Sequence, residues 1–223
     1  MVLSTILKTE AIIFDMDGTL LDTISDISSS VNSILKKYKF PQHSYEQYKV
    51  FIGNGIESLI KKALPVDFKG NYNNIFKEIE SEYKSNLNKK TIIYDGIIDL
   101  LEYLVFKNIK IGICTNKPHK HAIKCVNKYF KNFNFEIIGA GHSFPLKPNP
   151  KGILNIINKF KVESSKCLFV GDSGIDIFTA KNANILSVGA LWGFRSKKEL
   201  SNAGADFLFK NPLDFLIFLK KNL

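Results

Sequence analysis

The sequence contains few cysteines and a single arginine among its 223 residues. The three cysteines, Cys114, Cys125 and Cys167, are too few and too widely spaced for a disulfide framework or a zinc site. Cys114 and Cys167 lie inside apolar runs, which is typical of packed thiols. We therefore exclude a small disulfide-stapled protein and expect reduced cysteines.

Long hydrophobic runs are also absent. The opening residues MVLSTILKTE lack both the basic start and the long apolar stretch of a secretory leader. No later stretch approaches the length needed to cross a bilayer. We expect a cytoplasmic protein without a membrane partner, and either a monomer or a homodimer is compatible with the sequence.

The positive charge of the chain is dispersed. Basic residues number 31 and acidic residues 21, which gives a formal net charge of +10. Lysine pairs recur along the whole chain, but Arg195 is the one arginine, and guanine readout and bidentate phosphate binding favour arginine. We therefore expect no nucleic-acid partner, because a lysine-rich surface of this kind attracts small anionic molecules only mildly.

Short apolar runs alternate with amphipathic helical patterns along most of the chain. The runs cover residues 11–14, 109–114, 167–170 and 185–188, and each has the length of a buried strand. Helical stripes at 97–104 and 153–160 separate them. With 45% hydrophobic and 23% charged residues, the chain can bury a core. These observations predict an α/β fold with a Rossmann-like parallel sheet and helices on both faces.

The segment between residues 19 and 90 breaks this alternation. It contains helical stripes at 27–38 and 72–87 and no convincing strand. We expect a helical domain of residues 20–90 inserted after the first strand, and an α/β core domain of residues 1–19 and 91–223. A last helix at 212–219 is expected to pack on the sheet.

Polar residues follow the predicted strands at the ends where ligands bind in open α/β sheets. They are Asp15, Asp17, Gly18, Thr115, Asn116, Asp172 and Asp176, and Lys147 lies between two prolines ahead of the third strand. Each of these signals alone is weak, because a D-x-D is often a turn or a helix cap. Converging carboxylates at about 4 Å repel by roughly 4 kcal/mol per pair at an effective dielectric constant near 20, so such a cluster requires a cation. An all-oxygen set favours Mg²⁺ over zinc.

Four segments, FDMDGTLLDT, CTNKP, LKPNP and VGDSGIDIFTAKNA, resemble the four motifs of the haloacid dehalogenase superfamily. They span residues 14–183, and the later ALWGF is similar to the phosphoglycolate phosphatase-like branch. That branch carries a helical cap inserted after the first motif, where the sequence has its helical segment. The resemblance implies that the insertion is such a cap.

The resemblance also implies a mechanism. Asp15 would attack phosphorus and form an aspartyl-phosphate. Asp17 would protonate the leaving oxygen and then deprotonate the hydrolytic water. Mg²⁺ would be held by the carboxylates of Asp15 and Asp172 and by the backbone carbonyl of Asp17. An aspartate at position 17 also favours ester hydrolysis, because dehalogenases and phosphonate-cleaving members lack it.

The remaining motif residues would build the phosphate pocket. Thr115 would contribute its hydroxyl, Lys147 a point charge and Asn116 a hydrogen bond. Asp176 would orient Lys147 or the water around the metal. Gly18 would remove side-chain bulk where backbone approaches an anion.

The cap gives weaker signals. Its Gly53, Asn54 and Gly55 resemble the cap loop that meets the substrate, although a plain break between two helices explains this turn almost equally well. The cap contains no arginine, which counts against sugar-phosphate mutases, where a cap arginine holds the distal phosphate. The resemblance implies no role for histidine, so surface or supporting positions are expected for His119, His121 and His142.

The leading hypothesis is therefore a Mg²⁺-dependent phosphatase for a small phosphorylated metabolite, most similar to the enzymes that act on 2-phosphoglycolate. A related phosphatase acting on pyrophosphate, a sugar phosphate or a nucleotide is the first alternative. A non-catalytic binding protein on this fold is the second, and retention of both Asp15 and Asp17 counts against it.

Overall fold

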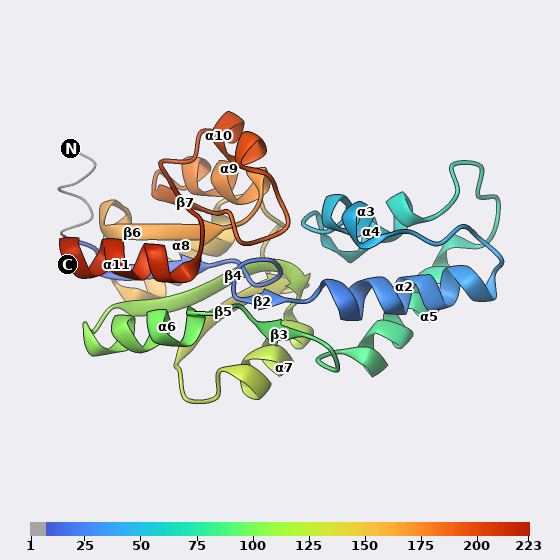
Figure 1. Ribbon diagram of the computed structural model, residues 1–223, viewed down its shortest axis with the longest axis horizontal. Coiled ribbons are helices and arrows are strands. Elements are labelled where there is room, and N and C mark those ends of the chain that lie inside the picture. The colour runs from blue at the N-terminus through green and yellow to red at the C-terminus, as the bar shows by residue number, and fades with distance from the viewer. Residues whose placement is uncertain (1–7) are drawn as a thin grey trace.

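The computed structural model describes residues 8–223 and consists of a larger α/β lobe and a smaller helical lobe (Figure 1). Residues 1–7 lie outside the described residues. They include most of the opening stretch MVLSTILKTE, which lacks the features of a secretory leader. Within residues 8–223, no helix combines the length and hydrophobicity needed to span a bilayer. The expected cytoplasmic location stays a prediction.

The larger lobe is built on a six-stranded sheet in the order β5-β4-β1-β6-β7-β8, in which every neighbouring pair is parallel. A separate two-stranded antiparallel sheet pairs β2 with β3. The strands are β1 (Ala11–Phe14), β2 (Leu21–Asp22), β3 (Ile92–Ile93), β4 (Lys110–Pro118), β5 (Phe135–Ala140), β6 (Cys167–Gly171), β7 (Leu186–Ala190) and β8 (Phe207–Phe209).

Helices occupy the segments between the strands, and a short 3-10 turn, Ser164–Lys166, precedes β6. The α-helices are α2 (Ile24–Lys37), α3 (Tyr45–Phe51), α4 (Gly55–Ala63), α5 (Tyr72–Asn86), α6 (Ile97–Phe106), α7 (His119–Tyr129), α8 (Lys151–Phe160), α9 (Gly174–Asn182), α10 (Lys197–Ala203) and α11 (Pro212–Asn222).

Helices cover both faces of the large sheet, as the alternation of side chains along β1 requires. Ile12 and Phe14 point into one core cluster together with α6, α7 and α11. Ala11 and Ile13 point into the opposite cluster with α8 and α9. Because successive strand residues face opposite sides, the continuous run AIIF is buried on both faces. The predicted Rossmann-like α/β fold is confirmed.

The four strands expected from apolar runs are present, but the sheet contains more. The edge strands β5 and β8 escaped the sequence analysis because their residues are largely half-buried. In addition, β4 continues to Pro118 past an irregularity in its pairing with β5. Thr115 and Asn116 therefore lie within the end of a strand, as does Lys117, and the expectation that Thr115 and Asn116 follow the strand is wrong.

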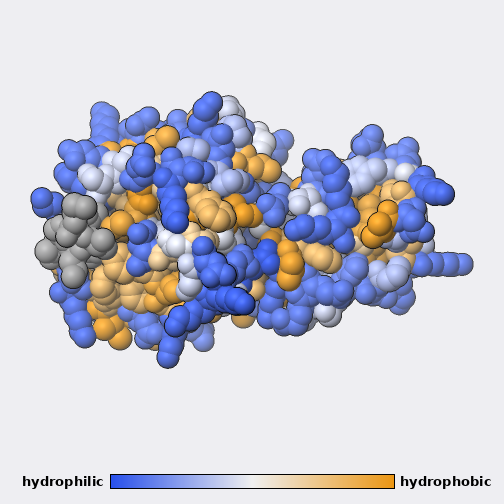
Figure 2. Space-filling view, turned by 90° about the horizontal axis from the view of Figure 1, so that it is seen from above, coloured by the Kyte–Doolittle hydropathy of each residue, from blue (hydrophilic) through white to orange (hydrophobic). Residues whose placement is uncertain are grey.

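The helical insertion after β1 is confirmed as a cap with a core of its own. Side chains from α2 to α5, among them Val31, Tyr48, Leu59 and Ile79, form one buried cluster. Figure 2 shows the narrowing between this smaller lobe and the larger one. The expectation that the segment holds no strand is wrong, because β2 lies at its start and pairs with β3 beyond its end. The boundaries 20 and 90 stay a proposal.

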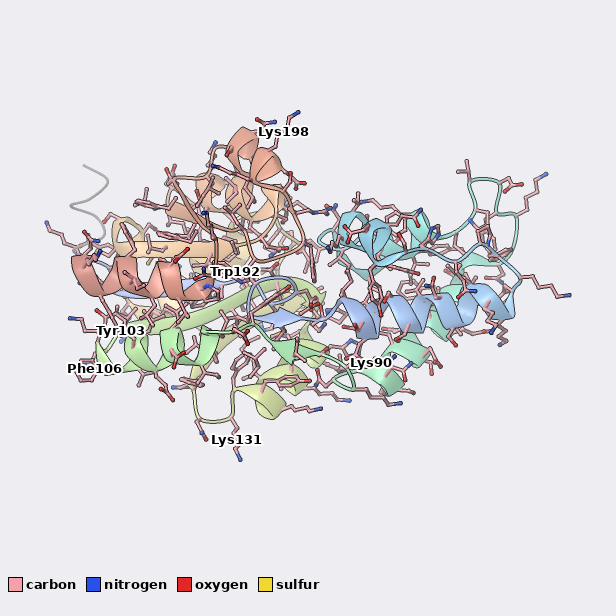
Figure 3. All side chains as sticks on the ribbon, viewed as in Figure 1. Lys90, Tyr103, Phe106, Lys131, Trp192 and Lys198 are labelled. Atoms are coloured by element: carbon pink, nitrogen blue, oxygen red, sulfur yellow. The ribbon has the colours of Figure 1, made fainter. Side chains whose placement is uncertain are left out.

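Buried polar contacts fix the base of the cap. One carboxylate oxygen of Asp26 in α2 accepts a hydrogen bond from the backbone of Lys90 at 2.8 Å. The other accepts from the backbone and the hydroxyl of Thr91 at 3.1 and 2.6 Å. In the segment before α2, the carbonyl of Thr19 accepts a hydrogen bond from the indole of Trp192 at 2.9 Å, and both Lys90 and Trp192 are labelled in Figure 3. The two segments that connect the core to the cap, one before α2 and one after α5, are thereby joined to each other and to the core.

Candidate active site

Three buried aspartates gather at the carboxyl ends of two neighbouring strands. Asp15 follows β1 and Asp172 follows β6, and these strands pair with each other. Asp176 lies in the first turn of α9. Each of the three offers a carboxylate oxygen, and these oxygens lie within 4.8 Å of one another. In Figure 1 this edge of the sheet faces the cap.

One lysine from a distant loop enters this acidic cluster. Nζ of Lys147 lies 2.8 Å from Oδ1 of Asp15 and 2.6 Å from Oδ1 of Asp176. The other oxygen of Asp176 accepts hydrogen bonds from the backbone and hydroxyl of Ser173 at 3.0 and 2.7 Å. Asp176 is thus held on two sides and can orient the lysine, which is one of the two roles expected for it.

The buried cluster has more negative than positive charge. Burial raises the pKa of Asp15 to about 6, even though Lys147 opposes the shift. Burial, then repulsion from Asp176 and Asp15, raises the pKa of Asp172 well above its usual value. Burial alone would lower the pKa of Lys147, but its two carboxylate partners raise it further. A hard divalent cation with oxygen ligands fits this donor set, because one lysine cannot balance three carboxylates.

Backbone closely surrounds the carboxylate of Asp172. Its Oδ2 accepts a hydrogen bond from the amide of Phe194 at 2.7 Å. Gly18 has a φ of +85°, and a Cβ on it would lie 2.3 Å from that oxygen. A Cβ on Gly193 would likewise lie 2.3 Å from Cβ of Asp172. The close approach expected at Gly18 is therefore made to the Asp172 carboxylate.

Asp17 is paired with a residue to which the sequence analysis gave no role. Nζ of Lys117 lies 2.8 Å from Oδ1 of Asp17 and also donates to the hydroxyl of Tyr83 from α5 of the cap. Burial would lower the pKa of Lys117, but Asp17 raises it well above its ordinary value. Burial raises the pKa of Tyr83, so its hydroxyl stays protonated. The signal for Lys117 was available in the motif CTNKP, whereas Tyr83 counted only as one member of an apolar stripe.

Asn116 links the cap loop to the Lys147 loop. Its side-chain amide donates to the carbonyl of Gly53 at 2.9 Å and to the carbonyl of Lys147 at 3.2 Å. Its oxygen accepts from the backbone of Lys147 at 2.8 Å. Both amide hydrogens are thereby engaged, so the expected hydrogen bond from this side chain to phosphate stays a prediction. Thr115 is buried, and its hydroxyl accepts from the backbone of Lys117 at 3.2 Å.

A cavity lies between these groups and the cap. About 50 Å³ is available to the centres of water-sized molecules, and a single water needs roughly 10–15 Å³ by the same measure, so a compact ligand fits. The lining comprises Asp15, Asp17, Ile27, Val31, Ile52, Gly53, Gly55, Ile56, Leu59, Ile79, Tyr83, Thr115, Asn116, Lys117 and Pro118. The predicted site residues that are not part of this lining are Gly18, Asn54, Lys147, Asp172 and Asp176. Asn54 instead faces a hollow beside Arg195.

The histidines and cysteines lie outside the acidic cluster. The rings of His119 and His142 are 4.8 Å apart beside β5, and His121 packs edge-on against Tyr83 at 5.4 Å. The expectation that all three cysteines are free is confirmed, and all are buried. His121 is buried, and the surface or supporting roles expected for the three histidines stay a prediction.

The fold and the acidic strand-end cluster are those of α/β hydrolases that carry an inserted helical cap. A sequence profile described as haloacid dehalogenase-like hydrolase matches residues 12–190. The chain therefore belongs to the haloacid dehalogenase-like hydrolases, and it is a phosphoric monoester hydrolase of that family.

Individual relatives agree with this assignment over nearly the whole chain. The phosphoglycolate phosphatase of Mannheimia succiniciproducens is 29% identical over 91% of this chain and 95% of its own length. That of Aquifex aeolicus is 29% identical over 95% and 97%. The crystal structure of a predicted phosphoglycolate phosphatase from Haemophilus somnus superposes with a TM-score of 0.85, at 27% identity, covering 95% of this chain and 98% of that one.

Proposed function

We propose that the protein hydrolyses a small phosphomonoester through an aspartyl-phosphate on Asp15, with Mg²⁺ as cofactor and 2-phosphoglycolate as the substrate. The observation that supports this most strongly is the buried cluster of Asp15, Lys147, Asp172 and Asp176. Through Asp15, this cluster reaches a cavity that Asp17 also lines. The names of the relatives support the choice of substrate.

In the first step, a carboxylate oxygen of Asp15 attacks phosphorus and forms a new O–P bond. The bond from phosphorus to the ester oxygen breaks at the same time, and Asp17 gives its proton to that oxygen. The Lys147 ammonium, 2.8 Å from Asp15, holds the attacking carboxylate and offers positive charge to the phosphoryl oxygens. The alcohol then leaves as a neutral product.

In the second step, Asp17 takes a proton from a water molecule, whose oxygen attacks the phosphorus of the aspartyl-phosphate. Inorganic phosphate leaves, and Asp15 and the protonated Asp17 are restored. The contact with Lys117, at 2.8 Å, keeps the Asp17 carboxyl group beside the cavity in both steps. One residue therefore acts as an acid in the first step and as a base in the second.

Asp15 and Asp172 would hold the cation with their carboxylates, and Asp17 with its backbone carbonyl. When bound, Mg²⁺ supplies positive charge that offsets the negative charge of the transferred phosphoryl group. Thr115, which lines the cavity, would donate its hydroxyl to a phosphoryl oxygen.

The cap limits the size of the leaving group. Hydrogen bonds that hold it over the site include those of Tyr83 with Lys117, of Gly53 with Asn116, and of the carbonyl of Ile52 with Arg195 at 2.8 Å. A compact acid fits the cavity more readily than a sugar or nucleoside, which favours 2-phosphoglycolate over the larger alternatives. We place the cap at residues 20–90 and expect it to open for product release.

Phosphate release from a panel of substrates tests this proposal. The panel contains 2-phosphoglycolate, pyrophosphate, a hexose phosphate and a nucleoside monophosphate, each assayed with Mg²⁺ or with EDTA. We expect Mg²⁺-dependent release with a preference for 2-phosphoglycolate. Preference for another member would overturn the substrate, and no release from any member would overturn the activity.

A further inference from the structure

Two buried polar groups in the cavity have hydrogen-bonding capacity that the structure leaves unused. The Lys117 ammonium has three hydrogens and two partners, Asp17 and the hydroxyl of Tyr83. That hydroxyl accepts from Lys117, and within residues 8–223 its own hydrogen has no acceptor. Their side chains are nearly inaccessible, with Lys117 1% and Tyr83 5% exposed. One N–H and one O–H therefore remain side by side at the cavity wall.

Buried donors of this kind are costly to leave unpaired. Both residues line the cavity, so a ligand placed there can satisfy them. The other cap side chains that line it are all apolar: Ile27, Val31, Ile52, Ile56, Leu59 and Ile79. Among the described residues, Lys117 is the one cationic side chain in the lining. With the phosphoryl group at Lys147, a second anionic group on a ligand therefore has one favourable place.

The contact between Lys117 and Asp17 places the donor pair close to the bond that breaks. Lys117 contacts Asp17, and in the proposed mechanism Asp17 protonates the ester oxygen. An acceptor bound by Lys117 and Tyr83 therefore lies next to the atoms bonded to that oxygen. A carboxylate on the carbon that bears the ester oxygen meets this requirement, and one further along a chain would be directed into the apolar cap wall.

We infer that Lys117 and Tyr83 form a carboxylate subsite, which makes the enzyme selective for esters whose phosphate and carboxylate share one carbon. This inference rests on the proposed function and identifies the residues that set its specificity. Tyr83 is carried by the cap, and Lys117 by the core. The subsite is therefore complete only when the cap contacts the core as it does here.

The first test changes the substrate and leaves the enzyme intact. We compare kcat/KM of the wild-type enzyme for 2-phosphoglycolate, its neutral amide and ethyl phosphate. The subsite predicts that loss of the carboxylate lowers kcat/KM by about tenfold or more, because a hydrogen-bonded charge is replaced by a group that leaves the donors poorly paired. Equal values for the three esters would overturn the inference and leave the phosphatase function standing. No turnover of any ester would overturn both.

The second test removes one donor with Tyr83→Phe, which keeps the ring and deletes the hydroxyl. The preference for 2-phosphoglycolate over ethyl phosphate should fall by about tenfold, mainly through a higher KM for 2-phosphoglycolate. Tyr72→Phe is the matched control, since Tyr72 is on the same helix and its exposed hydroxyl donates to the carbonyl of Glu57 at 3.2 Å, away from the cavity. That control should keep the wild-type preference.

A merely structural role for Tyr83 gives a different result. Tyr83→Phe would then lower kcat/KM for both esters by the same factor, and the preference between them would not move. That outcome would overturn the inference. Binding of 2-phosphoglycolate to Asp15→Asn, with and without Tyr83→Phe, provides a second readout by calorimetry. The subsite predicts weaker binding in the double variant, and equal binding would contradict it.

Discussion

The side-chain nitrogen of Lys147 lies 2.8 Å from Oδ1 of Asp15, so the expected nucleophile is in direct contact with a buried cation. The lysine comes from the loop before α8, whereas Asp15 ends the central strand β1. The charge of Lys147 offsets the cost of burying the Asp15 carboxylate at the end of a strand. Asp176 contacts the same lysine nitrogen and fixes the position of that nitrogen. The predictions below test what each part of this arrangement contributes.

Replacing Lys147 with methionine should affect both catalysis and stability. The change leaves Asp15 and Asp176 without their shared cation, and removal of one partner of a buried ion pair costs about 3–5 kcal/mol. Phosphate release should fall at least about a hundredfold, because a positive charge aimed at the transferred group is lost. Lys159→Met is the control: this exposed lysine pairs with Glu136 at the surface, and its loss should change the free energy of unfolding by about 1 kcal/mol or less.

In the metal-free protein, the Asp15 carboxyl should contribute less stability as the pH rises from acidic to neutral. Burial raises the pKa of Asp15 from 3.8 to about 6, so the folded state binds this proton more tightly than the unfolded chain does. The contribution is fully present below pH 3.8 and is lost as the pH rises through about 6. It amounts to about 3 kcal/mol in the free energy of unfolding. Urea titrations of the wild type and Asp15→Asn in EDTA across this range isolate it as the difference between the two proteins. His121, whose pKa burial lowers to about 4, changes stability in the opposite direction in both.

Mg²⁺ should reverse this trend. A cation bound to Asp15 and Asp172 competes with protons, so Mg²⁺ should raise the melting temperature more at pH 7 than at pH 5. Differential scanning fluorimetry with Mg²⁺ or EDTA measures the difference. An equal rise at both pH values would show that the buried carboxylates are not the binding site.

Gly18→Ala should weaken metal binding and activity together. The new Cβ would lie 2.3 Å from Oδ2 of Asp172, so that carboxylate must move. We expect activity to fall at least about tenfold, because small displacements of catalytic groups carry penalties of this size. Gly141→Ala is a matched control for backbone strain: its φ is +78°, and its Cβ would meet no atom within 4 Å. If both variants lose the same activity, strain alone explains the effect and crowding of Asp172 does not.

Asp26→Ala should loosen the base of the cap. The buried carboxylate accepts from Lys90 and from two groups of Thr91, and its removal leaves these donors unsatisfied. We expect a loss of about 2–4 kcal/mol in the free energy of unfolding, from urea titration. The exposed Asp67 of the cap serves as a control, and Asp67→Ala should have an effect within about 0.5 kcal/mol. Equal losses would contradict a specific role for Asp26.

The central sheet could be predicted from the sequence because its inner strands are buried on both faces. The run Ala11–Phe14 is continuous and apolar, and its neighbours in the sheet have the same character. Edge strands lack this signal, since β5 carries Glu136 and is only partly covered. The pair β2 and β3 has two residues in each strand, which is too short for any periodicity.

The candidate site could be predicted only in part. Asp15, Asp172 and Lys147 are found by motif because each occupies a fixed place near a strand end. Tyr83 has no such mark: its spacing in α5 is that of a core residue, and its ring is buried as that spacing indicates. Only the contact between cap and core, which no local pattern encodes, brings its hydroxyl to Lys117.

The central claim is that Asp15 becomes phosphorylated during turnover. The most direct test mixes enzyme with excess 2-phosphoglycolate and Mg²⁺, quenches with acid within milliseconds, and locates the phosphoryl group by peptide mass spectrometry. We predict phosphate on the peptide containing Asp15, sensitive to hydroxylamine, and none in Asp15→Asn. Rapid phosphate release without any phosphorylated peptide, or turnover retained in Asp15→Asn, would contradict the account.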